Sequence, residues 1–204
     1  MGESMSIKSK KYGIFGGSFD PIHNGHLTVA AYALEALELD FLYIIPAFNP
    51  PHKERVKASF NKRVEWLRKA FTSEKRAVIS TYEAEKGGPS YTIDTVRHFS
   101  KKHGTPPYLI LGEDSLKNIK SWYRFQELLK EAFIVVYPRY KRRASYAYDS
   151  LKSYEKRGII FLNAPLIQLS ATEIRHRVET KKSILGMVPE SILLEVIAFY
   201  ERNF

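Results

Sequence analysis

The chain has 204 residues, of which 44% are hydrophobic, and it contains no cysteine. This length is enough for one full hydrophobic core and predicts a single domain over residues 1–204. The missing cysteine excludes a disulfide framework, a thiol nucleophile and a cysteine-ligated metal. The net charge of +10 favours an anionic partner, which leaves nucleic acid, a charged membrane surface and small phosphorylated substrates as candidates.

The N-terminal segment Met1–Lys11 is polar and lacks the apolar stretch that is typical of a signal peptide. Met1-Gly-Glu-Ser ahead of the second methionine, Met5, is typical of a vector remnant, so we expect a flexible N-terminus outside the fold. No apolar run approaches the length of a membrane span. These features predict a cytoplasmic protein with no membrane partner.

Strands and helices alternate along the chain. Short apolar runs predict strands over Tyr12–Phe15, Phe41–Ile45, Ala77–Ser80, Tyr108–Leu111, Phe133–Tyr137 and Ile159–Leu162. Between them, apolar residues recur at helical spacing over His26–Leu39, Asn61–Phe71, Ile93–His103 and Phe125–Lys130, less regularly over Ala144–Glu155.

This alternation predicts an α/β fold with a doubly wound, mostly parallel sheet and helices on both of its faces. The strands are continuous apolar runs, as expected when crossover helices cover both faces of a sheet. A small helical segment at Pro189–Tyr200 follows the last strand. Ligands of such sheets bind beyond the carboxyl ends of the strands.

The loop after the first predicted strand has the features of a phosphate site. Gly16 and Gly17 let the backbone approach a ligand closely, and Gly25 lies where a helix begins. Free N–H groups and the positive end of the helix dipole favour an anion there. His23 and His26 add imidazole donors, so we expect this loop to hold a polyphosphate.

A second candidate phosphate site lies at Leu169–Arg175. Ser170 precedes Glu173 by three residues, which predicts a capping box that opens a short helix. Arg175 follows one turn inside this helix, within reach of an anion at its N-terminus. The alternative is that Ser170 only caps the helix and Arg175 only covers the surface.

The segment from Gly17 to His26, Gly-Ser-Phe-Asp-Pro-Ile-His-Asn-Gly-His, resembles the signature of the HxGH nucleotidyltransferases, and Leu169–Arg175 resembles the second phosphate-binding motif of that family. The resemblance implies a Rossmann-like fold and three catalytic residues, His23, His26 and Arg175. It also implies that the phosphates of ATP contact Gly16, Gly17, Ser18, Phe19, Gly25, Ser170 and Thr172.

Four further segments narrow the resemblance to one branch of the family. They are Pro50–Lys53, Gly88–Thr95, Leu111–Ser115 and Ser121–Tyr123. This set is similar to the nicotinate-nucleotide adenylyltransferases, whereas phosphopantetheine adenylyltransferase and the cytidylyltransferases share the histidine loop only. The implied reaction joins ATP to nicotinate mononucleotide in NAD biosynthesis, with Mg²⁺ accompanying ATP and no metal held by the protein.

The same resemblance assigns residues to the two nucleotides. For ATP it adds Gly112 and Asp114, whose carboxylate is placed to bind a ribose or, alternatively, to cap the next helix. For the acceptor it implies Asn49, Lys53, Tyr91, Thr92, Trp122, Tyr123 and Arg139. Trp122 and Tyr91 offer flat faces for a pyridine ring, although a place in the core is the alternative for Trp122.

Two local departures from these relatives affect the acceptor residues. Ala47 and Phe48 separate Asn49 from Pro46, where relatives often place the asparagine directly after the proline. After the fifth strand the order is Tyr137-Pro138-Arg139, where relatives commonly show Arg-Pro. We expect Arg139 to supply the same charge from one position along the chain.

The basic run Arg139–Arg143 is interpreted as a solvated loop, because no nucleic-acid-binding motif accompanies it. We therefore expect no nucleic-acid partner. Two alternatives to the proposed reaction stay open: a related adenylyltransferase for nicotinamide mononucleotide or another phosphorylated acceptor, and a non-catalytic module that binds nucleotide or RNA. A homo-oligomer is compatible with the sequence.

Overall fold

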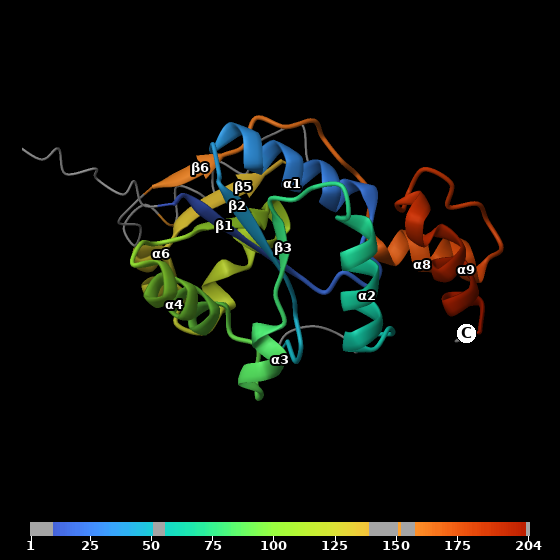
Figure 1. Ribbon diagram of the computed structural model, residues 1–204, viewed down its shortest axis with the longest axis horizontal. Helices are drawn as coiled ribbons and strands as arrows, with labels where there is room; N and C mark the ends of the chain where they lie inside the picture. Colours follow the sequence, from blue (N-terminus) through green and yellow to red (C-terminus); the bar gives the residue numbers. More distant parts are fainter. Residues whose placement is uncertain (1–9, 51–55, 139–150, 152–157, 203–204) are drawn as a thin grey trace, which may run out of the picture.

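The computed structural model describes residues 10–50, 56–138, 151 and 158–202 (Figure 1). Its centre is a six-stranded sheet in the order β3-β2-β1-β4-β5-β6, and every neighbouring pair runs parallel. The strands are β1 (Tyr12–Gly17), β2 (Phe41–Pro46), β3 (Ala77–Ile79), β4 (Tyr108–Gly112), β5 (Phe133–Tyr137) and β6 (Ile159–Phe161). The order reverses between β1 and β4, which confirms the predicted doubly wound sheet.

The helices occupy the predicted positions with shifted ends. They are α1 (Asn24–Ala36), α2 (Phe60–Ala70), α3 (Tyr82–Lys86), α4 (Thr92–His103), α5 (Glu113–Lys117), α6 (Phe125–Glu131), α8 (Ala171–Glu179) and α9 (Leu193–Arg202), with short 3₁₀ turns η1 (Ile119–Ser121) and η2 (Glu190–Ile192). The sequence pattern missed α3, which is too short to show a helical period. Except for Leu151, the helix expected over Ala144–Glu155 lies outside the described residues.

Successive side chains of the central strands pack into two separate cores. Phe15 and Ile44 join the first core, which α1 and α2 cover together with the C-terminal helices. Ile14 and Ile45 join the second, which α4 and α6 cover. Figure 1 shows α1 on one side of the sheet and the pair α4 and α6 on the other. Alternation along buried strands thus puts helices on both faces, as predicted.

The edge of the sheet departs from the expectation of buried strands. Val78 in the edge strand β3 is 39% exposed, although its segment is a continuous apolar run. An edge strand has one neighbouring strand and incomplete helix cover, so its apolar residues are less protected.

The C-terminal helices α8 and α9 form the end of the molecule beside α2 (Figure 1). Ile174 of α8 and Tyr200 of α9 are fully buried in the core that also contains Trp66 of α2. In the part of the chain that the structure describes, no helix is long and apolar enough to cross a membrane.

Candidate active site

A cavity of about 630 Å³ opens at the carboxyl ends of β1 and β4, where the strand order reverses. The ends of both strands line it, together with the loop after β1, the loop after β2, the start of α4 and the start of α8. This is the place at which doubly wound sheets bind ligands. The topology therefore brings segments that are far apart in the sequence around one cavity.

The histidine loop forms one wall of the cavity. His23 is the N-cap of α1, and the His26 backbone N–H donates to the His23 carbonyl at 2.8 Å. The His26 ring reaches back, because its Nδ1 accepts the backbone N–H of His23 at 3.2 Å. A neutral His26 ring therefore carries its proton on Nε2, which makes Nε2 a hydrogen-bond donor.

Neighbouring rings fix the orientation of these two imidazoles. The rings of His23 and His26 are stacked with centroids 3.7 Å apart, and Phe19 packs edge-on against His26 at 4.9 Å. Gly25 is required beneath them, because a Cβ there would lie 2.8 Å from Ile167 Cγ2 and 3.0 Å from His23 Nδ1. Gly25 thus supports the histidine pair by packing, and its own atoms do not line the cavity.

The opposite wall comes from the start of α8. Ser170 caps this helix by accepting the Glu173 N–H at 3.1 Å, as the capping box predicts. Arg175 lies one turn further, where its guanidinium donates to the Asp20 carbonyl at 2.7 Å and to Thr172 Oγ1 at 3.3 Å. Ser170, Thr172 and Arg175 all line the cavity, facing the loop that carries the histidines.

Two buried charged residues, Asp20 and Arg63, hold the loop after β1 in place. Asp20 is 4% exposed, and its carboxylate accepts the backbone N–H groups of Lys57 at 2.7 Å and Ala58 at 2.9 Å. Arg63 is 2% exposed and donates to the Ser18 carbonyl at 2.7 Å. The C=O and N–H of one trans peptide point in opposite directions, so this bond turns the Phe19 N–H away from Arg63.

The far end of the cavity follows β4 and β5. Gly112 ends β4 and lies against Tyr137, whose hydroxyl oxygen would be 2.9 Å from a Cβ at Gly112. Both residues line the cavity, as does Ser115 in the first turns of α5. Asp114 lies in the same helix turn, but the cavity wall does not include it.

Aromatic rings form the remaining side. Tyr91 is the N-cap of α4, and its ring lies 4.4 Å from that of Tyr123. Trp122 and Thr92 line the cavity beside them, and Tyr123 is 50% exposed. Ring faces here and hydrogen-bond donors at the histidine end make the two ends of the cavity chemically different.

The loop after β2 is tied to this aromatic side. Ser90 Oγ accepts the backbone N–H of Phe48 at 3.2 Å and that of Asn49 at 3.0 Å, while the Ser90 N–H donates to the Asn49 carbonyl at 2.9 Å. Glu83 of α3 is 8% exposed and lines the cavity. Its carboxylate also accepts the Phe48 N–H, at 3.3 Å, and the Thr95 hydroxyl, at 3.2 Å.

Comparison with known proteins agrees with this geometry. A model of the cytidylyltransferase-like family matches residues 14–177. A Thermotoga maritima protein named "Probable nicotinate-nucleotide adenylyltransferase" is 46% identical over 97% of both chains, and a Pseudothermotoga lettingae protein of the same name is 48% identical over 96% of this chain and 99% of its own. The chain belongs to the nicotinate-nucleotide adenylyltransferase family. The predictions of this family and of a nucleotidyltransferase are confirmed.

A solved structure supports the fold of this adenylyltransferase independently. The Plasmodium falciparum nicotinic acid mononucleotide adenylyltransferase complexed with NaAD superposes with a TM-score of 0.76 over 95% of each chain. The sequences are only 18% identical, so this likeness concerns the Rossmann-like architecture alone.

The adenylyltransferase fold brings most of the predicted site residues to one cavity. Those that line it are Gly16, Gly17, Ser18, Phe19, His23, His26, Tyr91, Thr92, Gly112, Trp122, Tyr123, Ser170, Thr172 and Arg175. Gly25, Asn49 and Asp114 do not line it. Asn49 is exposed, and the two residues between it and Pro46 agree with this different position. Lys53 and Arg139 lie outside the described residues.

Several residues of the adenylyltransferase site were not predicted from the sequence. Asp20 lies inside the histidine motif itself, and its carboxylate directly before a proline was the available signal. Arg63 carries a signal too, because it shares the buried stripe of α2 with Trp66 and Leu67. A charged residue on an apolar stripe requires a buried partner. Lys57 and Glu83 also line the cavity, and nothing in their local sequence marks them.

Burial and a nearby charge have opposite effects on the pKa of Arg63, which holds the loop after β1. Burial lowers the pKa of Arg63 from its ordinary value, and the nearby Asp20 carboxylate partly offsets this effect. An arginine stays protonated at neutral pH even so, because its ordinary pKa lies far above neutrality. The loop therefore rests on a buried positive charge.

Proposed function

We propose that this cavity holds ATP and nicotinate mononucleotide together and transfers the adenylyl group from one to the other. The products are nicotinate adenine dinucleotide, a precursor of NAD, and pyrophosphate. The observation that carries the proposal is a single cavity lined by hydrogen-bond donors such as His26 and Arg175 at one end and by the rings of Tyr91, Trp122 and Tyr123 at the other. The bound NaAD of the Plasmodium structure supports it.

The reaction is a direct displacement at the α-phosphorus of ATP. A phosphate oxygen of the mononucleotide forms a bond to that phosphorus, and the bond from the phosphorus to the oxygen bridging to the β-phosphate breaks. The attacking phosphate is largely ionised at neutral pH, since its second pKa is about 6, so no protein base is required. Catalysis then depends on positioning and on stabilising the charge of the phosphoryl oxygens.

We assign the phosphate contacts by position in the cavity. The Nε2–H of His26, with His23 beside it, is placed to donate to the α- and β-phosphates, and the backbone of Gly16–Phe19 lines the same wall. Ser170, Thr172 and Arg175 on the facing wall would hold the leaving pyrophosphate. Fixed donors aimed at developing charge are the main source of rate enhancement in such sites.

The residues present do not form a cage for a resident metal ion. Among the described residues, no group of three or more histidine, aspartate or glutamate side chains is arranged to hold one. Asp20 lines the cavity, but hydrogen bonds from the protein already occupy its carboxylate. We therefore propose that Mg²⁺ enters with ATP as part of the substrate, with phosphate oxygens and water as its ligands.

For the acceptor, we propose that the pyridine ring lies against Trp122, Tyr91 and Tyr123 and that its carboxylate meets the N-terminus of α4 at Thr92. Lys53, Asn49 and Arg139 stay predictions as further acceptor residues. A cytoplasmic location, a homo-oligomeric state and the lack of a nucleic-acid partner also stay predictions.

The test is an acceptor panel with ATP and Mg²⁺, in which pyrophosphate release is measured. We expect nicotinate mononucleotide to give the fastest release, compared with nicotinamide mononucleotide, phosphopantetheine and FMN. A faster rate with another acceptor would assign the enzyme to that acceptor. ATP binding without release for any acceptor would support the non-catalytic alternative. Reactions without acceptor are the control for simple ATP hydrolysis.

A further inference from the structure

The hydroxyl of Tyr200 connects the C-terminal helix to the histidine loop. Tyr200 lies in α9 with 0% exposure, and its hydroxyl donates to Asp20 Oδ1 at 2.6 Å across 180 positions of sequence. Burial, reinforced by the charge of Asp20, raises the pKa of Tyr200 well above its ordinary value. The group is therefore a neutral phenol whose O–H donates a hydrogen bond to the carboxylate throughout the neutral pH range.

Asp20 in turn contacts the proposed phosphate-binding arginine. Its backbone carbonyl accepts Arg175 Nη1 at 2.7 Å, while its Oδ2 lies 3.9 Å from the same nitrogen. The carboxylate itself is occupied by three donors: the N–H groups of Lys57 and Ala58, and Tyr200. Arg175 is thus held by the carbonyl and kept beyond hydrogen-bond distance of the carboxylate.

Removing one of the three donors would change whether Arg175 contacts the carbonyl or the carboxylate of Asp20. A buried carboxylate that loses a hydrogen bond attracts a nearby cation more strongly, because less of its charge is compensated. Arg175 is the cation that stands next to it. Its guanidinium would move from the carbonyl toward Oδ2 and away from the phosphate end of the cavity.

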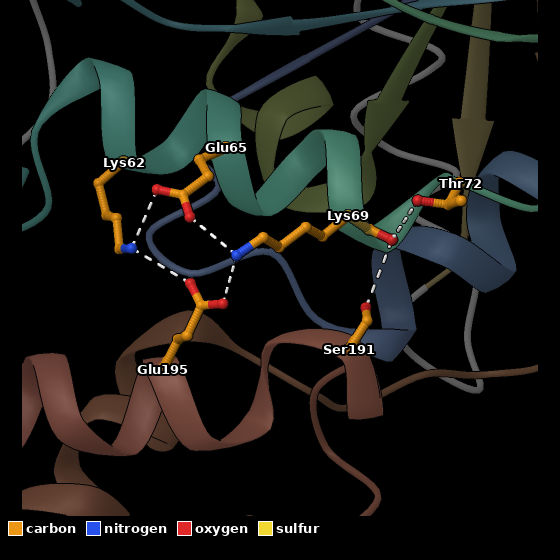
Figure 2. A network of polar contacts seen from close by, with 6 residues as sticks. All are labelled: Lys62, Glu65, Lys69, Thr72, Ser191 and Glu195. Atoms are coloured by element: carbon orange, nitrogen blue, oxygen red, sulfur yellow. Dashed lines mark hydrogen bonds and ion pairs between the residues drawn. The ribbon is translucent and has the colours of Figure 1, made fainter.

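The helix that carries Tyr200 also contacts α2 through other residues. Figure 2 shows Glu195 of α9 between Lys62 and Lys69 of α2, with Glu65 on the same lysines, and Ser191 Oγ donating to the Lys69 carbonyl. Phe199 of α9 packs edge-on against Trp66 of α2 at 5.5 Å. α2 also follows directly on Lys57 and Ala58, which bind Asp20 from the other side. α9, α2 and Asp20 therefore form one connected unit.

We propose that Tyr200 is a positioning residue for Arg175: through Asp20, its hydroxyl sets where the arginine meets the phosphates of ATP. The proposal rests on the proposed function of Arg175 in binding ATP. Tyr200 does not line the cavity, so any effect on substrate affinity must pass through other residues.

The test is a double-mutant cycle with Tyr200→Phe, which removes only the hydroxyl, and Arg175→Met. We expect Tyr200→Phe to raise the KM for ATP about fivefold and to leave the KM for nicotinate mononucleotide within about twofold. In the Arg175→Met background, the same change should have no further effect on the KM for ATP. KM does not depend on the fraction of folded protein, so a purely structural role would leave it unchanged.

The matched control is Tyr12→Phe. Tyr12 is 1% exposed and donates its hydroxyl to the Thr105 carbonyl at 2.8 Å, in the core that α4 covers. This variant also loses one hydroxyl from a buried tyrosine, but Tyr12 does not line the cavity, so both KM values should stay at their wild-type level.

Two results would overturn the proposal: an unchanged KM for ATP in Tyr200→Phe, or an equal rise in both arginine backgrounds. Calorimetric titration of the four proteins with a non-hydrolysable ATP analogue separates this inference from the proposed function. If the two substitutions have non-additive effects on the affinity for the analogue while the wild type shows no turnover, the proposed reaction is refuted and the positioning role of Tyr200 stands.

Discussion

The two ends of the cavity are built in different ways. At the phosphate end, the loop after β1 is fixed by buried charged groups: Asp20 is 4% exposed and Arg63 is 2% exposed. Several of their partners lie 37 to 180 positions away in the sequence, although Arg63 also donates to the Ala58 carbonyl five positions away. At the acceptor end, Tyr123 is 50% exposed and Phe48 is 43% exposed, and hydrogen bonds through Ser90 join two surface loops.

This difference follows from the two ligands. Phosphate oxygens carry concentrated charge, and donors that must stabilise them in a transition state gain most when their positions are fixed before reaction. An aromatic ring binds through a broad face, which tolerates small shifts of its neighbours. We therefore expect changes at the phosphate end to cost stability and turnover, and changes at the acceptor end to alter acceptor affinity.

The largest effect should come from Arg63→Met, which tests whether buried charge holds the phosphate end. The substitution leaves the Ser18 and Ala58 carbonyls without this donor and reduces the positive charge around Asp20, where Arg175 remains. We expect a loss of about 3–5 kcal/mol in the free energy of unfolding, measured by urea denaturation. The control is Arg76→Met, which removes a partly exposed arginine whose side chain pairs with Glu74 and should leave stability almost unchanged. Equal losses in both variants would show that the buried position is not special.

His26→Ala should lower kcat by about two to three powers of ten while ATP binding changes much less. The reason is that, in the proposed reaction, the Nε2–H of His26 donates to charge that develops during the transfer. Single-turnover rates and titrations with an ATP analogue separate the two effects. His26→Gln serves as the companion variant, because glutamine at this helix position can still accept the His23 N–H. An equal loss of ATP affinity and unchanged turnover of the bound complex would mean uniform binding instead.

The same contrast between the two ends explains what the sequence could predict. Every predicted strand is present, because buried parallel strands are uninterrupted apolar runs that turn residues separate. The four residues predicted to bind the phosphates all line the cavity, since each motif is short and lies at a helix start: His23, His26, Ser170 and Arg175. Local sequence is enough when the site is a strand end joined to a helix N-terminus.

The acceptor end was less predictable, because it is assembled from four separate segments. Asn49 follows a loop whose course depends on Ser90, forty-one positions away, and it ends up exposed. Glu83 lines the cavity from a five-residue helix that has no recognisable period. Asp20 was overlooked for another reason: the proline after it is a weak local signal, and its partners are backbone N–H groups and a tyrosine 180 positions away.

The choice between two acceptors tests the acceptor end of the cavity. Nicotinate mononucleotide should exceed nicotinamide mononucleotide by at least about tenfold in kcat/KM, since hydrogen bonds to a charged group contribute roughly 1.5–3 kcal/mol. Glu83 is the nearby carboxylate that could accept from an amide, but Phe48 and Thr95 already donate to it. Thr92→Val should lower the preference by reducing the rate with the acid alone. A ratio near one for the wild type would contradict a site lined by donors.

Ser90→Ala should have a smaller effect that is confined to the acceptor. The change removes the oxygen that accepts from Phe48 and Asn49 and loosens the loop after β2. We expect the KM for nicotinate mononucleotide to rise about threefold, with the KM for ATP unchanged, in steady-state kinetics. Thr72→Ala is the control, because its hydroxyl bonds only to carbonyls of its own helix end. A rise in the KM for ATP of the same size would mean that the two ends are not independent.

The smallest effect should come from the exposed ion pairs between α2 and α9, which support the phosphate end from outside (Figure 2). Glu195→Gln should lower Tm by at most about 2 °C at pH 7, because exposed ion pairs are weak and screened by solvent.

Hydrogen bonds from Lys69 and Lys62 lower the pKa of Glu195 below its ordinary value of 4.5, and the same lysines lower the pKa of Glu65 to about 2. A carboxylate with a lowered folded-state pKa contributes stability above its unfolded value and loses it as pH falls through the folded one. The Tm difference between wild type and variant should therefore be constant near neutrality and shrink as the pH falls below the ordinary value of 4.5. Differential scanning calorimetry across this range measures it. A loss comparable with that of Arg63→Met would mean that the surface network, and not the buried charge, holds the phosphate end together.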